Sequence, residues 1–324
     1  TIGESFGGIV ESGTRNVWIS VLTPDVDLTL SSSADNVIAG DDVVLKYTVL
    51  NNGEVDLTDV ELEDEAGTVF KTWPSLAVGV SYVATRAVTP AATRDYSASV
   101  VAAGGYSADA LCSVTVWSPA VAVSVPVSEE EIAAGDTVDV TYHIVNTGDL
   151  PLTDIELSDG VGTVLETGLS VPVGGSVDIA RTGAPGSSTS YLASAEGDYA
   201  VVGGSPSGVV TATAPTPASV TVWRPSVDID VSSDLSAVVL GSAAIVTYTA
   251  TNEGDTTLSD VVIRDASAGV LVTVPTLAPS ASHVVTRSVT INEETLVSAE
   301  ATATYGTIGE SFGGIVESGT RNVW

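Results

Sequence analysis

Two copies of the pentapeptide Gly-Glu-Ser-Phe-Gly have the spacing of a catalytic motif. They span Gly3–Gly7 and Gly309–Gly313, and they fit the G-x-S-x-G pattern in which a strand-to-helix turn exposes a nucleophilic serine. The same chemistry needs a helix after the serine, and a histidine and an acid elsewhere in the chain. No helical period follows either copy, and neither has a later histidine in the required setting. We therefore predict no enzymatic activity and expect the glycines to shape a hairpin tip.

Three pairs of aspartates recur at one spacing and are the candidate cation ligands. The pairs are Asp59 with Asp64, Asp154 with Asp159, and Asp260 with Asp265. Ca²⁺ takes six to eight oxygen ligands, which carboxylates at domain junctions could supply, although no EF-hand loop is present. The alternative is that these side chains cap turns on a solvated acidic face, and the pattern favours it. We expect no cofactor or metal, and calcium on the six aspartates is the open alternative.

Arginine and cysteine each give one further expectation. Arg86, Arg181 and Arg287 stand at one register in a chain poor in arginine, which indicates a repeated structural ion pair or strand clamp. Cys112 is the one cysteine, so no disulfide forms within the chain. It lies in phase with the valines that follow it, which predicts a buried core thiol.

The charge balance excludes one class of partner. There are 41 Asp and Glu residues against 10 Lys and Arg, for a formal net charge of −31. Affinity for nucleic acid needs clustered basic residues, so we expect no nucleic-acid partner. No apolar run approaches the roughly 18 residues of a membrane span, and nothing at the beginning is typical of a signal peptide. Methionine is absent, so we expect a segment of a processed or longer polypeptide.

The dipeptide Val-Trp recurs and divides the elements into three repeats. It ends at Trp18, Trp117, Trp223 and Trp324. The three repeats have the same number of residues between a proline near their start and the recurring arginine. The matching positions are Pro24, Pro119 and Pro225; Gly40, Gly135 and Gly241; Tyr47, Tyr142 and Tyr248; Asn51, Asn146 and Asn252; Gly53, Gly148 and Gly254; and the arginines and aspartates named above.

The pattern within a repeat is typical of β-structure. Apolar and polar residues alternate over 43–49 and 138–144, and more weakly over 244–250, which predicts strands with one buried face. The Asn-x-Gly sites between strands predict turns, in which Gly takes positive φ and Asn bonds its own backbone. About seven short strands in roughly 100 residues are typical of an immunoglobulin-like sandwich. The predicted fold is all-β, with three tandem immunoglobulin-like antiparallel β-sandwiches.

The repeat boundaries predict the domain organisation. We expect residues 1–18 to be the closing strand and half-hairpin of a preceding third domain. Residues 19–117, 118–223 and 224–324 are then the first, second and third Ig-like domains, and these ranges are called the first, second and third repeats below. Length varies mainly in the last hairpin and in the linkers. Short linkers with proline restrict a joint, so we expect a stiff rod with one looser joint per period.

One motif resembles a known group of repeats. Gly-Asp-x-Val-x-x-x-Tyr-x-x-x-Asn-x-Gly at Gly135–Gly148, followed by Leu-Thr-Asp-Ile-Glu-Leu-Ser-Asp at 152–159, resembles the CARDB-like and related tandem repeats of bacterial and archaeal surface proteins. The resemblance covers most of the chain. It implies Ig-like sandwiches that act as stalks, adhesins or sheath components. The last hairpins depart from the shared pattern, so it implies nothing about what they contact.

A verbatim duplication gives the leading functional hypothesis. Thr1–Trp18 returns without change as Thr307–Trp324, 306 residues later. We predict a non-enzymatic structural subunit of an extracellular or cell-surface filament, sheath or stalk with this period, which continues as one chain or self-associates. One alternative is donor-strand assembly, in which a terminal strand adds to a neighbour's sheet edge. Another is an adhesin whose variable last hairpins bind a carbohydrate or protein ligand.

Overall fold

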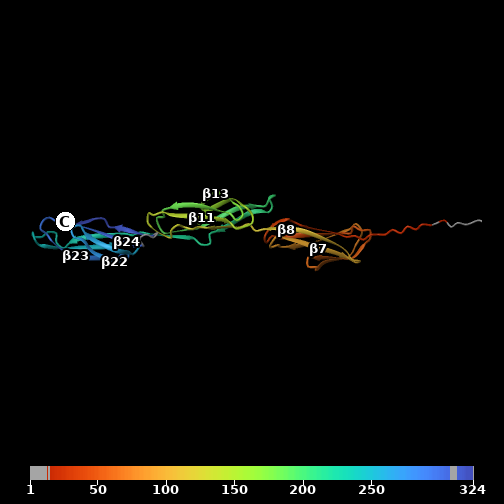
Figure 1. Cartoon of the computed structure of the whole chain (residues 1–324), viewed down its shortest axis with the longest axis horizontal. Helices are drawn as coiled ribbons and strands as arrows, with labels where there is room; N and C mark the ends of the chain where they lie inside the picture. The colour runs from red at the N-terminus through yellow and green to blue at the C-terminus, as the bar shows by residue number, and fades with distance from the viewer. Residues whose placement is uncertain (1–12, 14, 307–311, 324) are drawn as a thin grey trace, which may run out of the picture. The chain divides into compact units, whose positions relative to one another are not determined.

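The computed structural model describes residues 13, 15–306 and 312–323 (Figure 1). All regular structure in these ranges is β-strand, and they contain no helix, so the predicted all-β class is confirmed. The described residues form two compact units. One holds the chain up to Ser118 together with Val201–Pro206, and the other holds Pro119–Ala200 and the chain from Ser207 onward.

The first unit contains two sheets, whose strands lie in the orders β1-β3-β6 and β2-β8-β7-β4-β5. The strands are β1 (Asp27–Ser32), β2 (Asn36–Ile38), β3 (Val43–Leu50), β4 (Leu57–Asp64), β5 (Val69–Leu76), β6 (Ser81–Val88), β7 (Arg94–Ala102) and β8 (Tyr106–Trp117). Strands β7 and β8 form the predicted last hairpin (Figure 1). Neighbouring strands are antiparallel, except that β2 runs parallel to β8.

The two sheets of the first unit share one hydrophobic core. Along β3, Leu45, Tyr47 and Val49 are buried and alternate with more exposed residues, as the sequence pattern predicts. Leu62 of β4 and Val100 of β7 belong to the same buried cluster from the other sheet. The apolar stripe of each sheet is therefore covered by the other, which is the arrangement of a β-sandwich.

The second unit contains the strands of the second and third repeats. Those of the second repeat are β9 (Val121–Ser124), β10 (Glu131–Ala133), β11 (Val138–Asn146), β12 (Leu152–Asp159), β13 (Val164–Val171), β14 (Ser176–Gly183), β15 (Thr189–Tyr191), β16 (Ala193–Ala200), β17 (Ser207–Thr213) and β18 (Ala218–Trp223). Those of the third repeat are β19 (Val227–Ser233), β20 (Ala243–Asn252), β21 (Leu258–Asp265), β22 (Gly269–Leu277), β23 (Ser282–Thr290), β24 (Val297–Gly306), β25 (Gly313–Glu317) and β26 (Arg321–Val323).

Each of these two repeats has its own hydrophobic core. The cluster of the second repeat includes Tyr142, Ile144 and Leu157, and that of the third includes Tyr248 and Ile263. In the second repeat β11 pairs with β9 and β14, and in the third repeat the equivalent strand β20 pairs with β19 and β23. The boundaries of the three Ig-like domains, and their number, stay predictions.

The third repeat differs from the others at its final strand. Strand β8 pairs with β7 on one side and β2 on the other, and β18 pairs with β15 and β10. In the third repeat, β26 pairs with β24, while the segment Asp234–Ser242, which corresponds to the region of β2 and β10, forms no strand. One edge of β26 therefore lacks the short parallel strand that the other repeats have.

The duplicated sequence has two different environments. Near the end of the chain, Arg321–Val323 forms β26 and pairs with Val297–Ala299. The identical residues Arg15, Asn16 and Val17 form no strand. The side chains that follow in that copy are open to solvent, with Val17 84% and Trp18 92% exposed. The same sequence is thus a paired strand in one place and an unpaired segment in the other.

Candidate functional site

The most regular polar feature of the chain is a buried asparagine in each repeat. Asn51, Asn146 and Asn252 are at most 1% exposed. In the first repeat, Nδ2 of Asn51 donates to the carbonyls of Val55 at 2.8 Å and Leu76 at 2.9 Å, and its Oδ1 accepts from the N–H of Gly53 at 3.0 Å. The other two asparagines make the same three kinds of bond. Each side chain therefore ties its own turn to a distant strand.

The glycine of the Asn-x-Gly turn has a different role from the predicted one. The expectation that it takes positive φ is wrong for Gly53 and Gly254, which do not lie in the left-handed region. A Cβ on Gly53 would lie 2.3 Å from the backbone N of Asp25, and one on Gly254 would lie 2.5 Å from the carbonyl oxygen of Arg224. Glycine is required because the linker backbone passes against the turn.

A carboxylate beside this glycine holds the linker residue that precedes the proline. Glu54 Oε2 accepts a hydrogen bond from the backbone N–H of Thr23 at 3.0 Å, and the N–H of Glu54 donates to the Thr23 carbonyl at 2.9 Å. In the third repeat, Asp255 Oδ1 accepts from the N–H of Arg224 at 2.6 Å. These bonds fix the linker to the repeat that follows it. They add to the restriction expected from proline alone.

The first aspartate of each candidate calcium pair has a backbone explanation. Asp59, Asp154 and Asp260 adopt positive φ of 49°, 50° and 48°. Asp154 and Asp260 lie inside register shifts, in β12 against β16 and in β21 against β24. Aspartate is among the residues that tolerate the left-handed conformation best. Its recurrence here therefore follows from a repeated bulge in the strand.

The second aspartate of each pair caps the turn that follows its strand. One carboxylate oxygen accepts two backbone N–H groups at 2.7–3.0 Å. The capping residues are Asp64, Asp159 and Asp265. The hydrogen bond from the Thr68 N–H, helped by Arg86, holds the pKa of Asp64 below its usual value. The Thr163 N–H does the same for Asp159. The interpretation as turn caps is confirmed for these three residues, but the expectation of a solvated face is wrong for Asp265, which is buried.

The recurring arginine makes an ion pair in every repeat, with one change of partner. The pairs are Arg86 with Asp64 at 3.1 Å, Arg287 with Asp265 at 3.2 Å, and Arg181 with Glu166 at 3.0 Å. Arg181 also donates to the carbonyl of Leu165 at 3.0 Å. The predicted ion pair is therefore present, and in two repeats it uses the aspartate that caps the turn.

The third repeat buries this cluster most completely. Asp265 is 2% exposed and accepts hydrogen bonds from the hydroxyls of Ser267 and Tyr248. Burial alone raises the pKa of Asp265, but the hydrogen bonds from Ser267, Tyr248 and the Ala268 N–H outweigh it and lower the pKa to about 2. Burial and the bond to Asp265 raise the pKa of Tyr248 to about 12. Asp265 is therefore held as a carboxylate within the core.

Calcium binding by the six aspartates stays a prediction. One member of each pair is an exposed residue at positive φ and the other is occupied by its own turn. Among the residues that the structure describes, no group of three or more His, Cys, Asp or Glu side chains is placed to hold a metal ion.

The serine, histidine and cysteine candidates have separate outcomes. Ser5 and Ser311 lie outside the described residues. His143 pairs through Nδ1 with Asp178 on the neighbouring strand of a sheet. Cys112 packs against the core as its phase predicts, but it is only half-buried, where the sequence predicts a buried thiol. The reason is that β8 is largely exposed before Val114. Partial burial raises the pKa of the Cys112 thiol.

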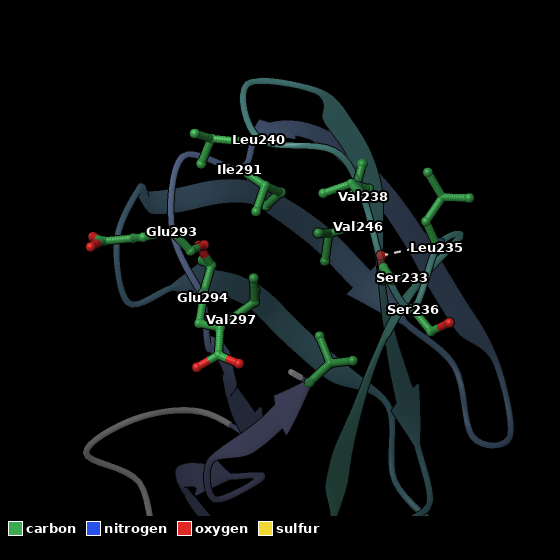
Figure 2. Close-up of a pocket in the computed structure, with 14 residues that line it drawn as sticks. Ser233, Leu235, Ser236, Val238, Leu240, Val246, Ile291, Glu293, Glu294 and Val297 are labelled. Atoms are coloured by element: carbon green, nitrogen blue, oxygen red, sulfur yellow. Dashed lines mark hydrogen bonds between the residues drawn. The ribbon is translucent and has the colours of Figure 1, made fainter.

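An apolar pocket of about 690 Å³ lies in the third repeat (Figure 2). We call it the apolar slot. It is lined by Ser233, Leu235, Ser236, Ala237, Val238, Leu240, Ala244, Val246, Ile291, Glu293, Glu294, Thr295, Val297 and Val323. Figure 2 shows Val238, Val246 and Ile291 around the space, with the carboxylate of Glu293 extending away from it. The sequence analysis did not predict it.

One side chain at the slot is smaller than its counterparts in the other two repeats. Val297 follows Arg287 at the spacing at which Tyr96 follows Arg86 and Tyr191 follows Arg181. In the first repeat, the Tyr96 ring is 7% exposed and belongs to the core. The third repeat therefore lacks a whole aromatic ring at this position. Aligning the repeats for side-chain volume, as well as for residue type, would have found the signal.

Comparisons with known proteins give little to add to this geometry. No family model and no curated protein matches the chain. A solved structure concerning host cell surface retention of a 1.5-MDa bacterial ice-binding adhesin is 17% identical, with a TM-score of 0.39, over 92% of this chain and 96% of that one. The BSP domain of a biofilm-associated protein is 11% identical, with a TM-score of 0.24, over 93% and 66%. A tetra-tandem repeat in the extending region of a large adhesion protein is 17% identical, with a TM-score of 0.25, over 93% and 74%.

Likenesses of this size decide neither fold nor function for this chain. Since no family model matches, the resemblance to CARDB-like repeats stays a prediction. The described residues also contain no helix long and apolar enough to cross a membrane.

Proposed function

We propose that this chain is a structural segment of an extracellular filament, sheath or stalk with a 306-residue period. It consists of three Ig-like sandwiches, at 19–117, 118–223 and 224–324, and residues 1–18 complete the third sandwich of a preceding period. The chain continues or self-associates through these ends. A formal net charge of −31 keeps long molecules of this kind soluble and apart.

The observation that carries the proposal is the duplicated segment in its two environments. Arg321–Val323 pairs with Val297–Ala299 of β24, so this sequence fits the last strand of the third sandwich. Arg15–Val17 has the same sequence and no strand partner. In a periodic chain, a preceding copy of β24 supplies that partner. The buried asparagine of each repeat further supports tandem sandwiches of one design.

The linker geometry supports a mechanical role, in which the chain carries tension along its length. The hydrogen bonds of Thr23 to Glu54 and of Arg224 to Asp255 hold the linker at the turn. A linker fixed in this way transmits force into the sandwich and restricts bending at the joint. A stalk or filament needs both properties, whereas an isolated binding domain needs neither.

The denatured size of the native material tests the proposal. A periodic array predicts chains much longer than 324 residues on a denaturing gel, and long, regularly beaded particles by electron microscopy. Donor-strand assembly predicts the same particles but a single band of about the mass of this chain, 32.7 kDa. Compact single particles together with a single band would contradict both forms.

The last hairpin of the second repeat favours a second candidate function, that of an adhesin. Strand β17 exposes Val209, which is 52% accessible, and this hairpin is longer than its counterpart in the first repeat. A variable hairpin with exposed apolar residues suits recognition of a carbohydrate or protein ligand. Replacement of Glu196–Thr216 by the shorter hairpin of the first repeat is expected to abolish such binding without unfolding the protein. Unchanged binding to host or biofilm material would remove this candidate.

A further inference from the structure

Strand β17 lies at the edge of a sheet, and its outer side has no partner. The sheet has the order β13-β12-β16-β17, and β17 pairs with β16 alone, without a register shift. The carbonyl of Pro206 and the N–H of Ala214 bond toward β16. Because backbone groups alternate between the two sides of an antiparallel strand, every second residue of β17 directs its N–H and C=O away from β16. These residues are Ser207, Val209, Thr211 and Thr213. In the described part of the chain, no hydrogen bond reaches those outward groups.

Other long edge strands carry the features that keep a sheet edge from pairing with another chain. Charged residues, proline and bulges serve this purpose, as does a very short strand. Strand β5 contains Lys71 and Pro74, β22 contains Pro275, and β13 contains Glu166 and several register shifts. No residue over 199–223 is charged. Among the described edge strands of more than four residues, only β17 has no charge, proline or register shift.

The sequence of β17 is complementary to itself when two copies run antiparallel. A two-fold axis at Val210 places this residue opposite its own copy and places Val209 opposite Thr211. Ser207 then lies opposite Thr213, and the outward backbone groups of each pair face one another. Pairs of β-branched and of hydroxyl side chains stabilise antiparallel strands. A two-fold interface has to be self-complementary, and β17 meets this requirement in its side chains and in its free backbone groups.

Charge permits this contact at physiological ionic strength. The carboxylates beside β17 on its own sheet belong to Glu196 and Asp198 of β16, which are exposed and lie opposite Thr211 and Val209. In a pair of molecules the two β16 strands would be three strand spacings apart, about 14 Å. This distance exceeds the Debye length of about 8 Å at physiological salt. The repulsion is therefore largely screened, and we expect association to strengthen as salt is raised.

We propose that β17 pairs with β17 of a second copy of this chain, antiparallel and about a two-fold axis at Val210. The two sheets then form one continuous sheet across both molecules. The contact is isologous, so it joins two chains side by side and ends at the pair. It goes beyond the proposed function because it links neighbouring chains laterally and uses neither end of the sequence.

Cysteine trapping across the two-fold axis tests the contact. In a Cys112→Ser background of the full chain, Val210→Cys is compared with Thr213→Cys. The backbone groups of Val210 point toward β16, so it meets its own copy in a non-hydrogen-bonded pair. The Cα atoms of such a pair are about 4.5 Å apart, which suits a disulfide. Thr213 lies opposite Ser207 instead, which separates its two copies by about 20 Å.

The control has the more accessible position, since Thr213 is exposed and Val210 is half-buried. Random collisions therefore favour Thr213→Cys, whereas the proposed register favours Val210→Cys. Under mild oxidation we expect a disulfide-linked dimer from Val210→Cys and little dimer from Thr213→Cys on a non-reducing gel. Equal yields from the two variants, or monomer alone from Val210→Cys, would overturn the proposal.

A matched pair of charge substitutions provides a second measurement on folded protein. Val209 and Val164 are 52% and 49% exposed, and they lie on β17 and β13, the opposite edges of one sheet. Val209→Asp and Val164→Asp each add one negative charge and remove no buried side chain, so both should keep the melting temperature.

The two substitutions differ in what they place at the contact. Val209→Asp brings two carboxylates together across the two-fold axis and should lower the dimer association constant, measured by sedimentation, by about tenfold or more. Val164→Asp should leave it unchanged. An association constant that falls equally in both variants, or in neither, would overturn β17 as the site. The length of the native chains on a denaturing gel does not depend on this result, so its failure and that of the proposed function are distinguishable.

Discussion

Replacement of Asn51 by alanine is expected to destabilise the first unit far more than the same change at its neighbour. Asn51 is 0% exposed, and its side chain makes three hydrogen bonds to backbone groups at 2.8–3.0 Å. Asn52 is exposed. The two positions are adjacent in the chain and chemically identical, so Asn52→Ala is a matched control.

The structure gives the magnitude. Three hydrogen bonds at about 1 kcal/mol each set a loss of roughly 3 kcal/mol. The Leu76 carbonyl would remain buried without this partner, and a buried acceptor left unpaired costs about 1–3 kcal/mol, which raises the total toward roughly 5 kcal/mol. Asn52→Ala should stay within about 0.5 kcal/mol of the unmodified protein.

Hydrogen exchange by mass spectrometry on the full chain measures this loss. Peptides from β3 and β4 report opening of the first unit, and those from β11 and β12 provide an internal reference. A loss of 3 kcal/mol accelerates exchange through opening by about a hundredfold. Equal exchange rates in Asn51→Ala and Asn52→Ala would refute the account of the buried asparagine.

Three further predictions follow from the same geometry. The low pKa of Asp265, about 2 against a usual 3.8, stabilises the third repeat above pH 4. Roughly 2–3 kcal/mol of that stability is lost as the pH falls toward 2, and Asp265→Asn should flatten the acid limb of a pH-dependent unfolding curve. Gly254→Ala should destabilise the third repeat by about 1–3 kcal/mol in a denaturation assay, because its Cβ would lie 2.5 Å from a backbone oxygen. The control Gly183→Ala should be neutral in the same assay, since a Cβ there meets nothing within 4 Å. Calcium in place of a chelator should leave the melting temperature unchanged, since the aspartates already serve the backbone; a rise that saturates with calcium would support the calcium alternative.

The strands and their buried faces could be predicted because apolar and polar residues alternate along each strand. Leu45, Tyr47 and Val49 alternate with exposed residues in the sequence as they do in the sandwich. Asp64, Asp159 and Asp265 could be predicted as turn caps for a similar reason, since each accepts from N–H groups within four residues of itself. A hydrogen bond between residues close in the chain produces a spacing that the sequence itself shows.

Features that depend on distant backbone were not predictable from the pattern. The sequence pattern Asn-x-Gly suggests a left-handed glycine, yet Gly53 and Gly254 serve close approach by a linker that pattern alone cannot position. The bond from Asn51 to Leu76 joins residues 25 positions apart. The apolar slot lies beside Asp234–Ser242, which forms no strand, and no sequence motif marks the loss of that strand.

Hydrogen exchange of the duplicated segment tests the central claim most directly. A two-period chain is prepared in which residues 1–306 precede the complete 324-residue sequence. Its three copies of Arg-Asn-Val, at the start, the junction and the end, are followed in peptides that extend into their distinct neighbours. The account predicts that the copy at the start exchanges at once, while the copy at the junction is as protected as Arg321–Val323. Rapid exchange at the junction would contradict the proposal that residues 1–18 complete the preceding sandwich.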